Sequence, residues 1–554
     1  MIRSIEIAGA LARRRSVRAG AGVLAILGLA AGSLPLLDAP GYELGEVGAL
    51  LAALLAPAVG LAAWRLERDR ADASPWHAWL GASLVLGGLL AALFAGALLR
   101  AAFGPCSAVG RAAGFLPLLG VPSALLGAAL AVALAVLTRG RRALAAALYA
   151  FAALASLSDS LRAAYLGPAA FVFDPLLGAF PGPIYDEALV PDLRALLLRA
   201  AALLEGVAIA AFAEAFVRAS RAGPRAAARA AAGPALVLLL AAAGSAGAQA
   251  ALSALALGGE REEVVRALGG RREGPRCTVV YPSEKPPAQA AALLDECEFH
   301  VHGVSAALGI ARPPHVTAYV HRSAEEKRRL VGAAGTDFAK PWLGELHVVD
   351  APLPHPNLRH ELVHAIAAAA AEGPFRVPAR AYVLVSTGLV EGIAVALETP
   401  RSRWTVHEWC HAAKRLRLLP DVRRIVGPAG FWAEPPARAY TAAGSFLRFV
   451  LESRGAAAVR EAYRTGDLAR ATGVPLDVLA AEWERFLDGV ELPPGIEVAA
   501  RARLSRGSLF TRACAREVAA LEARAGQAAA AGRTDRACAL YREAAVRSGS
   551  AADE

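Results

Sequence analysis

The sequence predicts an α-helical membrane bundle of about seven spans, followed by a water-soluble α+β domain and a short helical tail. Hydrophobic residues make up 56% of the 554-residue chain and the mean hydropathy is +0.41, which is too apolar for an ordinary soluble protein. The apolar excess lies almost entirely before about residue 258. Beyond it, charged residues and amphipathic stretches are typical of a globular chain. We therefore assign residues 1–257 to the membrane.

Seven apolar runs in this first half have the length of membrane spans. A helix needs about 20 predominantly apolar residues to cross the hydrocarbon core. The fifth run has the shortest apolar core, because Ser156, Ser158 and Asp159 interrupt it. The runs are 19–37, 46–64, 78–99, 114–137, 143–161, 195–217 and 233–257.

Arginines near the ends of these runs predict the orientation. Cytoplasmic loops carry an excess of basic residues, and here the N-terminal tail and every second connection are rich in arginine. We therefore expect a cytoplasmic N-terminus and an extracytoplasmic segment after residue 257. This alternation requires all seven spans, because removing one span would place arginine-rich and arginine-poor connections on the same side of the membrane. The arginine-rich set is Arg3, Arg13, Arg14, Arg15, Arg18, Arg65, Arg68, Arg70, Arg139, Arg141, Arg142, Arg218, Arg221, Arg225 and Arg229, whereas the alternate connections hold only Arg100, Arg111, Arg162 and Arg194.

The formal charge of +10 raises the question of a nucleic-acid partner. Much of the basic excess lies in the short loops between the apolar runs, where arginine sets topology. We therefore expect no nucleic-acid partner, and the predicted partner of the first half is the lipid bilayer. The sequence does not indicate an oligomeric state.

Three ionisable residues, Arg199, Glu205 and Glu214, lie inside the sixth run. Such groups are costly in a membrane and usually face the interior of the bundle. Two interpretations follow, namely polar contacts within the bundle or at its ends, or a transport pathway. The first interpretation is the simpler one.

Six cysteines are spread along the chain, and none forms a Cys-x-x-Cys motif, so a structural zinc site is not expected. If the second half lies outside the cytoplasm, Cys277 with Cys297 and Cys514 with Cys538 are candidate disulfides. The alternative is that they are buried thiols.

The second half begins with a charged, glycine-containing linker, 258–276, and continues as a mixed α+β domain. Short β-branched and aromatic runs at 278–281, 316–320 and 346–349 predict strands. Residues 287–308 have helical periodicity, and the chain after residue 356 is mainly helical. The later predicted helices are 387–399, 404–418, 440–454, 456–464 and 476–488.

The tail, 500–554, contains two alanine-rich amphipathic segments between about 508 and 548. The stretch from Gly532 to Tyr541 resembles one tetratricopeptide-type helical hairpin. One such unit cannot bury its own apolar face. We therefore expect it to pack against the preceding soluble domain.

The principal motif of the second half is His360-Glu361-Leu362-Val363-His364. On a helix, the two histidines lie on one face about one turn apart, where both imidazoles can reach one zinc ion. Glu361 then lies beside the metal without binding it, and is placed to take a proton from water.

A catalytic zinc site needs a third protein ligand and an open fourth position. The best candidate ligand is Glu391 in Ser386-Thr387-Gly388-Leu389-Val390-Glu391-Gly392-Ile393-Ala394, where Ser386 or Thr387 can cap a new helix. Glu398 follows one to two turns later, and is either a hydrogen-bond partner of a ligating histidine or solvated.

The motif followed by Leu-Val-Glu-Gly-Ile-Ala resembles the gluzincin peptidases of the thermolysin and aminopeptidase-N lineage, and most of all their peptidase MA-like domains. The resemblance covers about residues 277–490 and implies a thermolysin-like fold. It implies His360, His364 and Glu391 as Zn²⁺ ligands and Glu361 as general base. It extends to Tyr440-Thr441-Ala442-Ala443-Gly444, similar to a Tyr-x-x-Gly segment, which implies Tyr440 as donor to the developing oxyanion; the alternative is that Tyr440 is a core residue.

The resemblance implies a membrane-anchored zinc metallopeptidase that acts on a peptide or protein substrate outside the cytoplasm. The Gly-x-Met-Glu-Asn stretch of aminopeptidase N is missing, since Met1 is the one methionine, so exopeptidase action is unsupported. Proteolysis inside the membrane is not expected, because the apolar run after Glu361 is only about half of a span. The alternative function is a catalytically idle, peptidase-like binding or sensor module on a membrane anchor.

Overall fold

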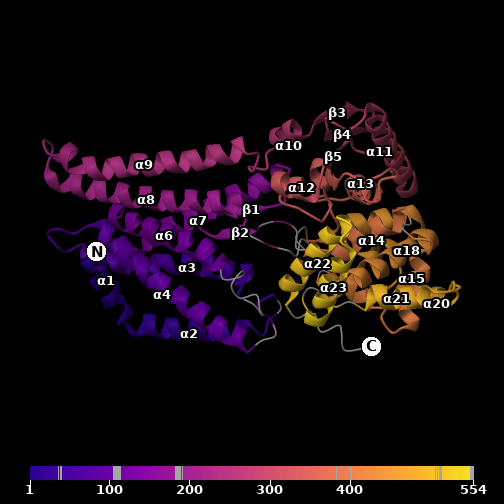
Figure 1. Ribbon diagram of the computed structural model, residues 1–554, viewed down its shortest axis with the longest axis horizontal. Helices are drawn as coiled ribbons and strands as arrows, with labels where there is room; N and C mark the ends of the chain where they lie inside the picture. The colour runs from indigo at the N-terminus through magenta and orange to yellow at the C-terminus, as the bar shows by residue number, and fades with distance from the viewer. Residues whose placement is uncertain are drawn as a thin grey trace. The chain divides into compact units, whose positions relative to one another are not determined.

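The computed structural model divides the chain into two compact units (Figure 1). Unit 1 comprises Met1–Gly259 and Ala513–Glu554, and unit 2 comprises Glu260–Arg512. The residues that the structure describes are 1–34, 36–37, 40–103, 106, 114–180, 182, 189, 191–381, 384–399, 402–427, 429–505, 507, 510 and 514–548.

Unit 1 is built mainly from long apolar helices. Among the described residues, six helices are long and apolar enough to cross a membrane. Figure 1 shows α8 and α9 running side by side along the unit, and the two helices pack against each other over their length. The six helices are α3 (Tyr42–Glu67), α4 (Pro75–Ala102), α6 (Phe115–Leu137), α7 (Arg142–Leu166), α8 (Leu193–Ala222) and α9 (Ala227–Ala254).

The first predicted span, 19–37, does not form a seventh helix of full length. The N-terminal segment is divided into α1 (Ile2–Ala12) and α2 (Arg15–Ala31), with an extended backbone at Arg14 between them. At 17 residues, α2 lies at the short end of the range of membrane-spanning helices. It packs on the second half of α4, where the backbones meet at Gly28 and Gly96. The break lies within the cluster Arg13, Arg14 and Arg15, whose charges are costly in hydrocarbon.

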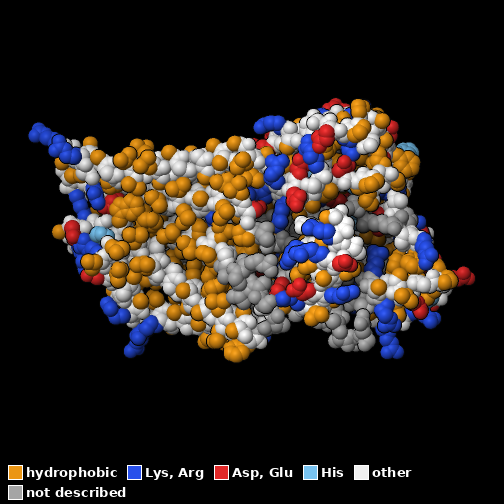
Figure 2. Space-filling view, in the orientation of Figure 1, with side chains coloured by type: hydrophobic (Ala, Val, Ile, Leu, Met, Phe, Trp, Pro, Cys, Tyr) orange, Lys and Arg blue, Asp and Glu red, His pale blue; other side chains and the backbone are white. Residues whose placement is uncertain are grey.

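The surface of unit 1 is strongly apolar along the long helices. Leu54, Phe151 and Leu239 expose 72%, 70% and 67% of their surface, which is unusual for large apolar side chains of a soluble protein. Figure 2 shows this apolar surface, with Lys and Arg side chains gathered at the end of the unit at the left of the view. Six candidate spans and this surface indicate an integral membrane protein.

The arginine-rich connections of unit 1 lie together at one end. Arg3 pairs with Asp72, which joins the N-terminal helix to the α3–α4 connection, with nitrogen–oxygen distances of 2.6 Å. Arg221 donates to the carbonyl of Ala73 at 2.7 Å, so the end of α8 lies there too. The side chain of Arg68 lies against Gly140 in the α6–α7 connection. The arginine-rich connections, which alternate with arginine-poor ones along the sequence, therefore also lie together in space.

The ionisable residues inside α8 all have hydrogen-bond partners. Arg199 is buried and donates to the carbonyls of Leu118, Leu119, Asp174 and Pro175. Pro122 lacks the N–H that would bond to Leu118, so the guanidinium satisfies a carbonyl that the proline leaves open.

Two glutamates of α8 accept hydrogen bonds from serine hydroxyls of neighbouring helices. Glu214 accepts from the Ser74 hydroxyl at the start of α4 at 2.7 Å, and Glu205 accepts from Ser245 of α9 at 3.2 Å. The interpretation of these residues and Arg199 as polar contacts within the bundle is confirmed.

The C-terminal hairpin consists of α22 (Ala515–Ala530) and α23 (Thr534–Arg547). It belongs to unit 1, and not to the preceding soluble domain as the sequence had indicated. A disulfide joins Cys514 to Cys106, in the connection between α4 and α6. The expected pair Cys514–Cys538 is therefore wrong, and Cys538 is a free, exposed thiol. Residues 549–554 of the predicted tail lie outside the described residues.

Unit 2 contains a five-stranded mixed sheet in the order β3-β4-β5-β7-β6. The three predicted strands are confirmed as the parallel centre of the sheet, and the two antiparallel edge strands were not predicted. The segment 258–276, expected to be a linker, contains α10 (Arg261–Leu268) and the edge strand β3. The strands are β3 (Gly269–Glu273), β4 (Cys277–Pro282), β5 (Val316–His321), β6 (Phe338–Lys340) and β7 (Glu345–Val349).

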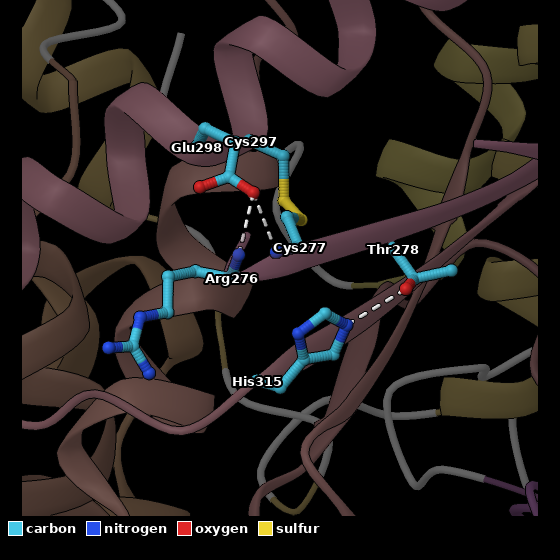
Figure 3. The surroundings of a disulfide bond; sticks show 6 residues. All are labelled: Arg276, Cys277, Thr278, Cys297, Glu298 and His315. Atoms are coloured by element: carbon cyan, nitrogen blue, oxygen red, sulfur yellow. Dashed lines mark hydrogen bonds between the residues drawn. A yellow bond between two sulfur atoms is a disulfide. The ribbon is translucent and has the colours of Figure 1, made fainter. Parts of the chain in front are cut away.

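Helix α11 (Pro287–Leu308), which matches the predicted helix 287–308, covers the sheet together with α13 (Leu358–Ala367). The expected disulfide Cys277–Cys297 is present and ties the start of β4 to α11 (Figure 3). Beside it, the Glu298 carboxylate accepts from the backbone N–H groups of Arg276 and Cys277, both at 2.8 Å. The disulfides are consistent with an extracytoplasmic position of these segments.

The remainder of unit 2 is mainly helical. The two predicted helices 440–454 and 456–464 are joined in α18 (Pro436–Thr465), which is broken at Gly455, where φ is +81°. α14 (Thr387–Leu397) packs against both α13 and α18, so the core extends from the sheet into the helical part. The other helices are α12 (Ala324–Val331), α15 (Val406–Arg415), α16 (Val422–Ile425), α17 (Gly430–Ala433), α19 (Leu468–Thr472), α20 (Leu476–Asp488) and α21 (Ile496–Leu504).

Candidate metal centre

The helix that carries the His-Glu-x-x-His motif, α13, is held in place by a buried histidine that precedes it. The Nδ1 atom of His355 accepts from the backbone N–H groups of Asn357 at 3.2 Å and Leu358 at 3.1 Å. Its Nε2 donates to the Val349 carbonyl at 2.9 Å, at the end of β7. His355 therefore caps the helix and links its start to the sheet.

The second helix of the site, α14, begins after Ser386. This serine is the N-cap residue, but its hydroxyl donates to the Val426 carbonyl at 2.6 Å instead of accepting from the helix. The expected side-chain cap is therefore absent, and the serine ties the start of α14 to α16. Thr387 accepts from the Trp432 indole N–H at 3.1 Å.

Two glycines allow α14 to approach its neighbours closely. A Cβ atom on Gly388 would lie 2.2 Å from the carbonyl oxygen of Ile425, and one on Gly392 would lie 2.9 Å from that of Ala443 in α18. Gly392 follows Glu391 directly, so this close packing fixes the distance of the carboxylate from the rest of the site.

Replacing Gly388 by alanine is expected to destabilise unit 2 by about 1–3 kcal/mol, because the added methyl group must displace backbone. Thermal unfolding of the purified protein measures this. Gly303→Ala is the matched control, because the nearest atom to a Cβ there is 3.7 Å away, in the Arg359 side chain. We expect that variant to be as stable as the wild type or slightly more stable. Equal stability of all three proteins would contradict the close approach at Gly388.

The three side chains expected to bind metal converge. The Glu391 Oε2 atom lies 3.4 Å from His360 Nε2 and 3.5 Å from His364 Nε2. One donor atom from each of the three residues lies within 4.8 Å of the others, and both histidines are buried. Two atoms bound to one zinc ion at tetrahedral angles are about 3.4 Å apart. The donor set and its spacing therefore fit a metal ion.

Charge within the group links metal binding to proton release. Burial lowers the pKa of His360, but hydrogen bonds with Glu391 and Glu398 outweigh burial and raise it to about 10. Burial raises the pKa of Glu391, whereas the positive charge of His364 and hydrogen bonds from both histidines lower it well below its usual range. Both shifts favour an imidazolium–carboxylate pair in the metal-free group, so metal binding competes with the proton on His360.

Glu398 positions the first histidine. Its Oε2 lies 3.0 Å from His360 Nδ1, so Glu398 is a hydrogen-bond partner of the first histidine of the motif. Such contacts fix the ring orientation and direct the other nitrogen toward a metal. The end of α14 is held by Arg448, which donates to the Ala396 carbonyl at 3.0 Å, and by Arg359, which donates to that of Leu397.

A cleft of about 270 Å³ opens beside the three residues. Glu361, which is 6% exposed, lines this cleft, and burial raises its pKa. Tyr440 lines the cleft too, with its ring 6.4 Å from that of His360 and 5.1 Å from that of Phe431. The structure thus brings the five site residues expected from the sequence close together, on the three helices α13, α14 and α18. Other lining residues are Asp337, Asn357, Val395, Thr441 and Arg503.

One residue that lines this cleft, Asp337, was not expected from the sequence, and it lies far from the motif along the chain. Asp337 accepts from Asn357 Nδ2 at 2.6 Å and pairs with the buried Lys327. A search with protein-family models finds no match to the chain, and no curated protein matches it.

Proposed function

We propose that this protein is a membrane-anchored zinc metallopeptidase of the gluzincin type, which hydrolyses peptide bonds of a peptide or protein substrate. The observation that carries the proposal is the convergence of His360, His364 and Glu391. His360 and Glu361 both line the adjoining cleft. Two imidazoles and one carboxylate form a donor set typical of catalytic zinc, which keeps a fourth position open.

A zinc ion held by these side chains would supply Lewis-acid activation of water and of a peptide carbonyl. Glu361 is the general base: it takes a proton from the attacking water and passes it to the leaving amine. Because burial raises the pKa of Glu361, its carboxylate accepts a proton more readily near neutral pH than an exposed glutamate would. Tyr440 donates a hydrogen bond to the carbonyl oxygen as negative charge develops there. The position of Tyr440 beside His360 supports this role.

The proposed domain organisation is a membrane region, 1–257, a peptidase domain that comprises unit 2, including its edge strand β3, and the C-terminal hairpin of α22 and α23. We place the N-terminus in the cytoplasm and the peptidase domain outside it. The segregation of the arginine-rich connections at one end of unit 1 supports this orientation, as do the two disulfides.

Removal and return of the metal tests the proposal. The detergent-purified full-length protein is expected to contain about one zinc ion per chain and to cleave unfolded casein or a peptide library. Treatment with 1,10-phenanthroline should abolish cleavage, and stoichiometric Zn²⁺ should restore it. Mass spectrometry of the products would separate internal from terminal cleavage. Bound zinc without turnover of any substrate would favour the binding or sensor module instead, and a failure to bind zinc would overturn both.

A further inference from the structure

A positively charged side chain that is not part of the metal centre lines the cleft. Among the described residues around the cleft, Arg503 is the one lysine or arginine, and it shares the cleft with His360 and Glu361. Arg503 belongs to the last turn of α21, and its side chain is exposed. It can therefore meet a molecule that enters the cleft.

The packing of α21 holds Arg503 at this place. The guanidinium lies over the ring of Trp409 in α15, 4.9 Å from the ring centroid. The buried residues of α21, namely Ile496, Ala500 and Leu504, pack in one cluster with the same tryptophan. Contact with the aromatic ring restrains the guanidinium, so less conformational freedom is lost when it binds an anion.

The start of α18 adds a second positive element to the cleft. Pro436 and Ala437, in the first turn of this helix, line the cleft. The turn contains no acidic residue, and among the described side chains none caps it, so the partial positive charge of the helix end is not offset there. Arg438 donates from Nε to the Leu504 carbonyl, which ties this turn to the end of α21 that carries Arg503.

Two acidic side chains of the cleft have cationic or polar contacts of their own. Asp337 pairs with the buried Lys327, and Glu398 contacts His360 Nδ1. These contacts offset the negative charge of both groups. A carboxylate that enters the cleft is therefore attracted to the side where Arg503 lies.

We propose that Arg503 is a specificity-determining residue, whose guanidinium binds a carboxylate of the substrate together with the first turn of α18. The inference rests on the proposed function and adds a substrate class to it, namely peptides that carry a carboxylate near the cleaved bond. The carboxylate belongs to an acidic side chain or to the end of the peptide. It must be near that bond because the cleft, at about 270 Å³, is small and also contains His360 and Glu361.

Three short peptides of otherwise identical sequence separate the two sources. The first has a glutamate and an amidated C-terminus, the second a glutamine and an amidated C-terminus, and the third a glutamine and a free C-terminus. The varied residue is moved through the positions on both sides of the cleaved bond. For the purified full-length protein with zinc, we expect kcat/KM on one of the carboxylate-bearing peptides to exceed that on the neutral peptide by about 10–100-fold, the effect typical of a charged hydrogen bond.

Arg503→Met removes the positive charge and keeps the length of the side chain. It should lower kcat/KM on the preferred peptide by about 10–100-fold and leave that on the neutral peptide unchanged. Arg503→Lys keeps the charge and should restore part of the preference. Arg501→Met is the matched control, since Arg501 is an exposed arginine of the same helix and is not among the described residues that line the cleft. This variant should show the preference of the wild type.

Binding is measured separately by fluorescence anisotropy of labelled peptides in the Glu361→Gln background, where the peptides should stay largely uncleaved. Adding Arg503→Met to that background should weaken binding of the preferred peptide to the level of the neutral one. This measurement does not depend on turnover, and the comparison of the three peptides on the wild type does not depend on the folding of any variant.

The outcomes distinguish this inference from the proposed function. If the wild type cleaves the three peptides equally well, or if Arg503→Met lowers kcat/KM on all of them alike, the role of Arg503 is overturned and the peptidase remains. If the wild type cleaves none of them, but a carboxylate-bearing peptide binds more tightly than the neutral one and Arg503→Met removes the difference, the carboxylate site remains and the peptidase fails. Equal binding without cleavage would overturn both.

Discussion

Glu361→Gln is expected to lower peptide turnover by about 10²–10⁴-fold, the contribution typical of a general base, while zinc remains bound. Glutamine has nearly the shape of glutamate and fits the same buried place between the motif histidines. It cannot accept the proton of the attacking water. Because Glu361 is not one of the three converging donors, the metal site should persist.

The measurement is kcat/KM on a peptide substrate, with zinc content determined on the same sample. Glu452→Gln is a suitable control, since Glu452 is a half-exposed carboxylate that pairs with Arg448 on α18. That variant should keep full turnover. Undiminished turnover in Glu361→Gln would exclude it as the base, and loss of zinc together with turnover would indicate that its role is structural.

Glu391→Gln is expected to reduce the bound zinc from about one ion per chain to nearly none, and so to remove activity. An amide is a much poorer zinc ligand than a carboxylate, and the two histidines alone form an incomplete site. Glu398→Gln should behave differently, because Glu398 contacts the far nitrogen of His360 and is not one of the three converging donors. We expect it to keep zinc with about 10–100-fold weaker affinity.

Equilibrium dialysis against buffered Zn²⁺ measures both variants beside the wild type. The order of affinity should be wild type, then Glu398→Gln, then Glu391→Gln. If Glu391→Gln held zinc as tightly as the wild type, Glu391 would not be a ligand. If the two variants were equally weak, the distinction between ligand and positioning residue would fail.

The sequence was informative where structure follows from local periodicity. The central strands and α11 were predicted because β-branched runs and helical spacing are visible within a few residues. The convergence of His360 and His364 follows from the geometry of one helical turn. The edge strands β3 and β6 and the helix α10 are short and charged. They form because they pack on the sheet, and the local sequence pattern gives no signal of that packing.

Glu398 illustrates why the sequence left two interpretations of one residue open. Helical periodicity places it two steps off the face of Glu391, but the helix ends at Leu397 and the backbone at Glu398 is extended, with ψ of 161°. The direction of its side chain is therefore set by how the chain leaves the helix.

The disulfide between Cys106 and Cys514 affects how unit 2 could be released by proteolysis. The two cysteines are 408 residues apart, and all of unit 2 lies between them in the chain. A protease that cuts once in the segment after Leu257 would leave unit 2 covalently attached through its C-terminal side. Release of unit 2 would require a second cut or reduction of that bond, because a closed covalent loop retains it.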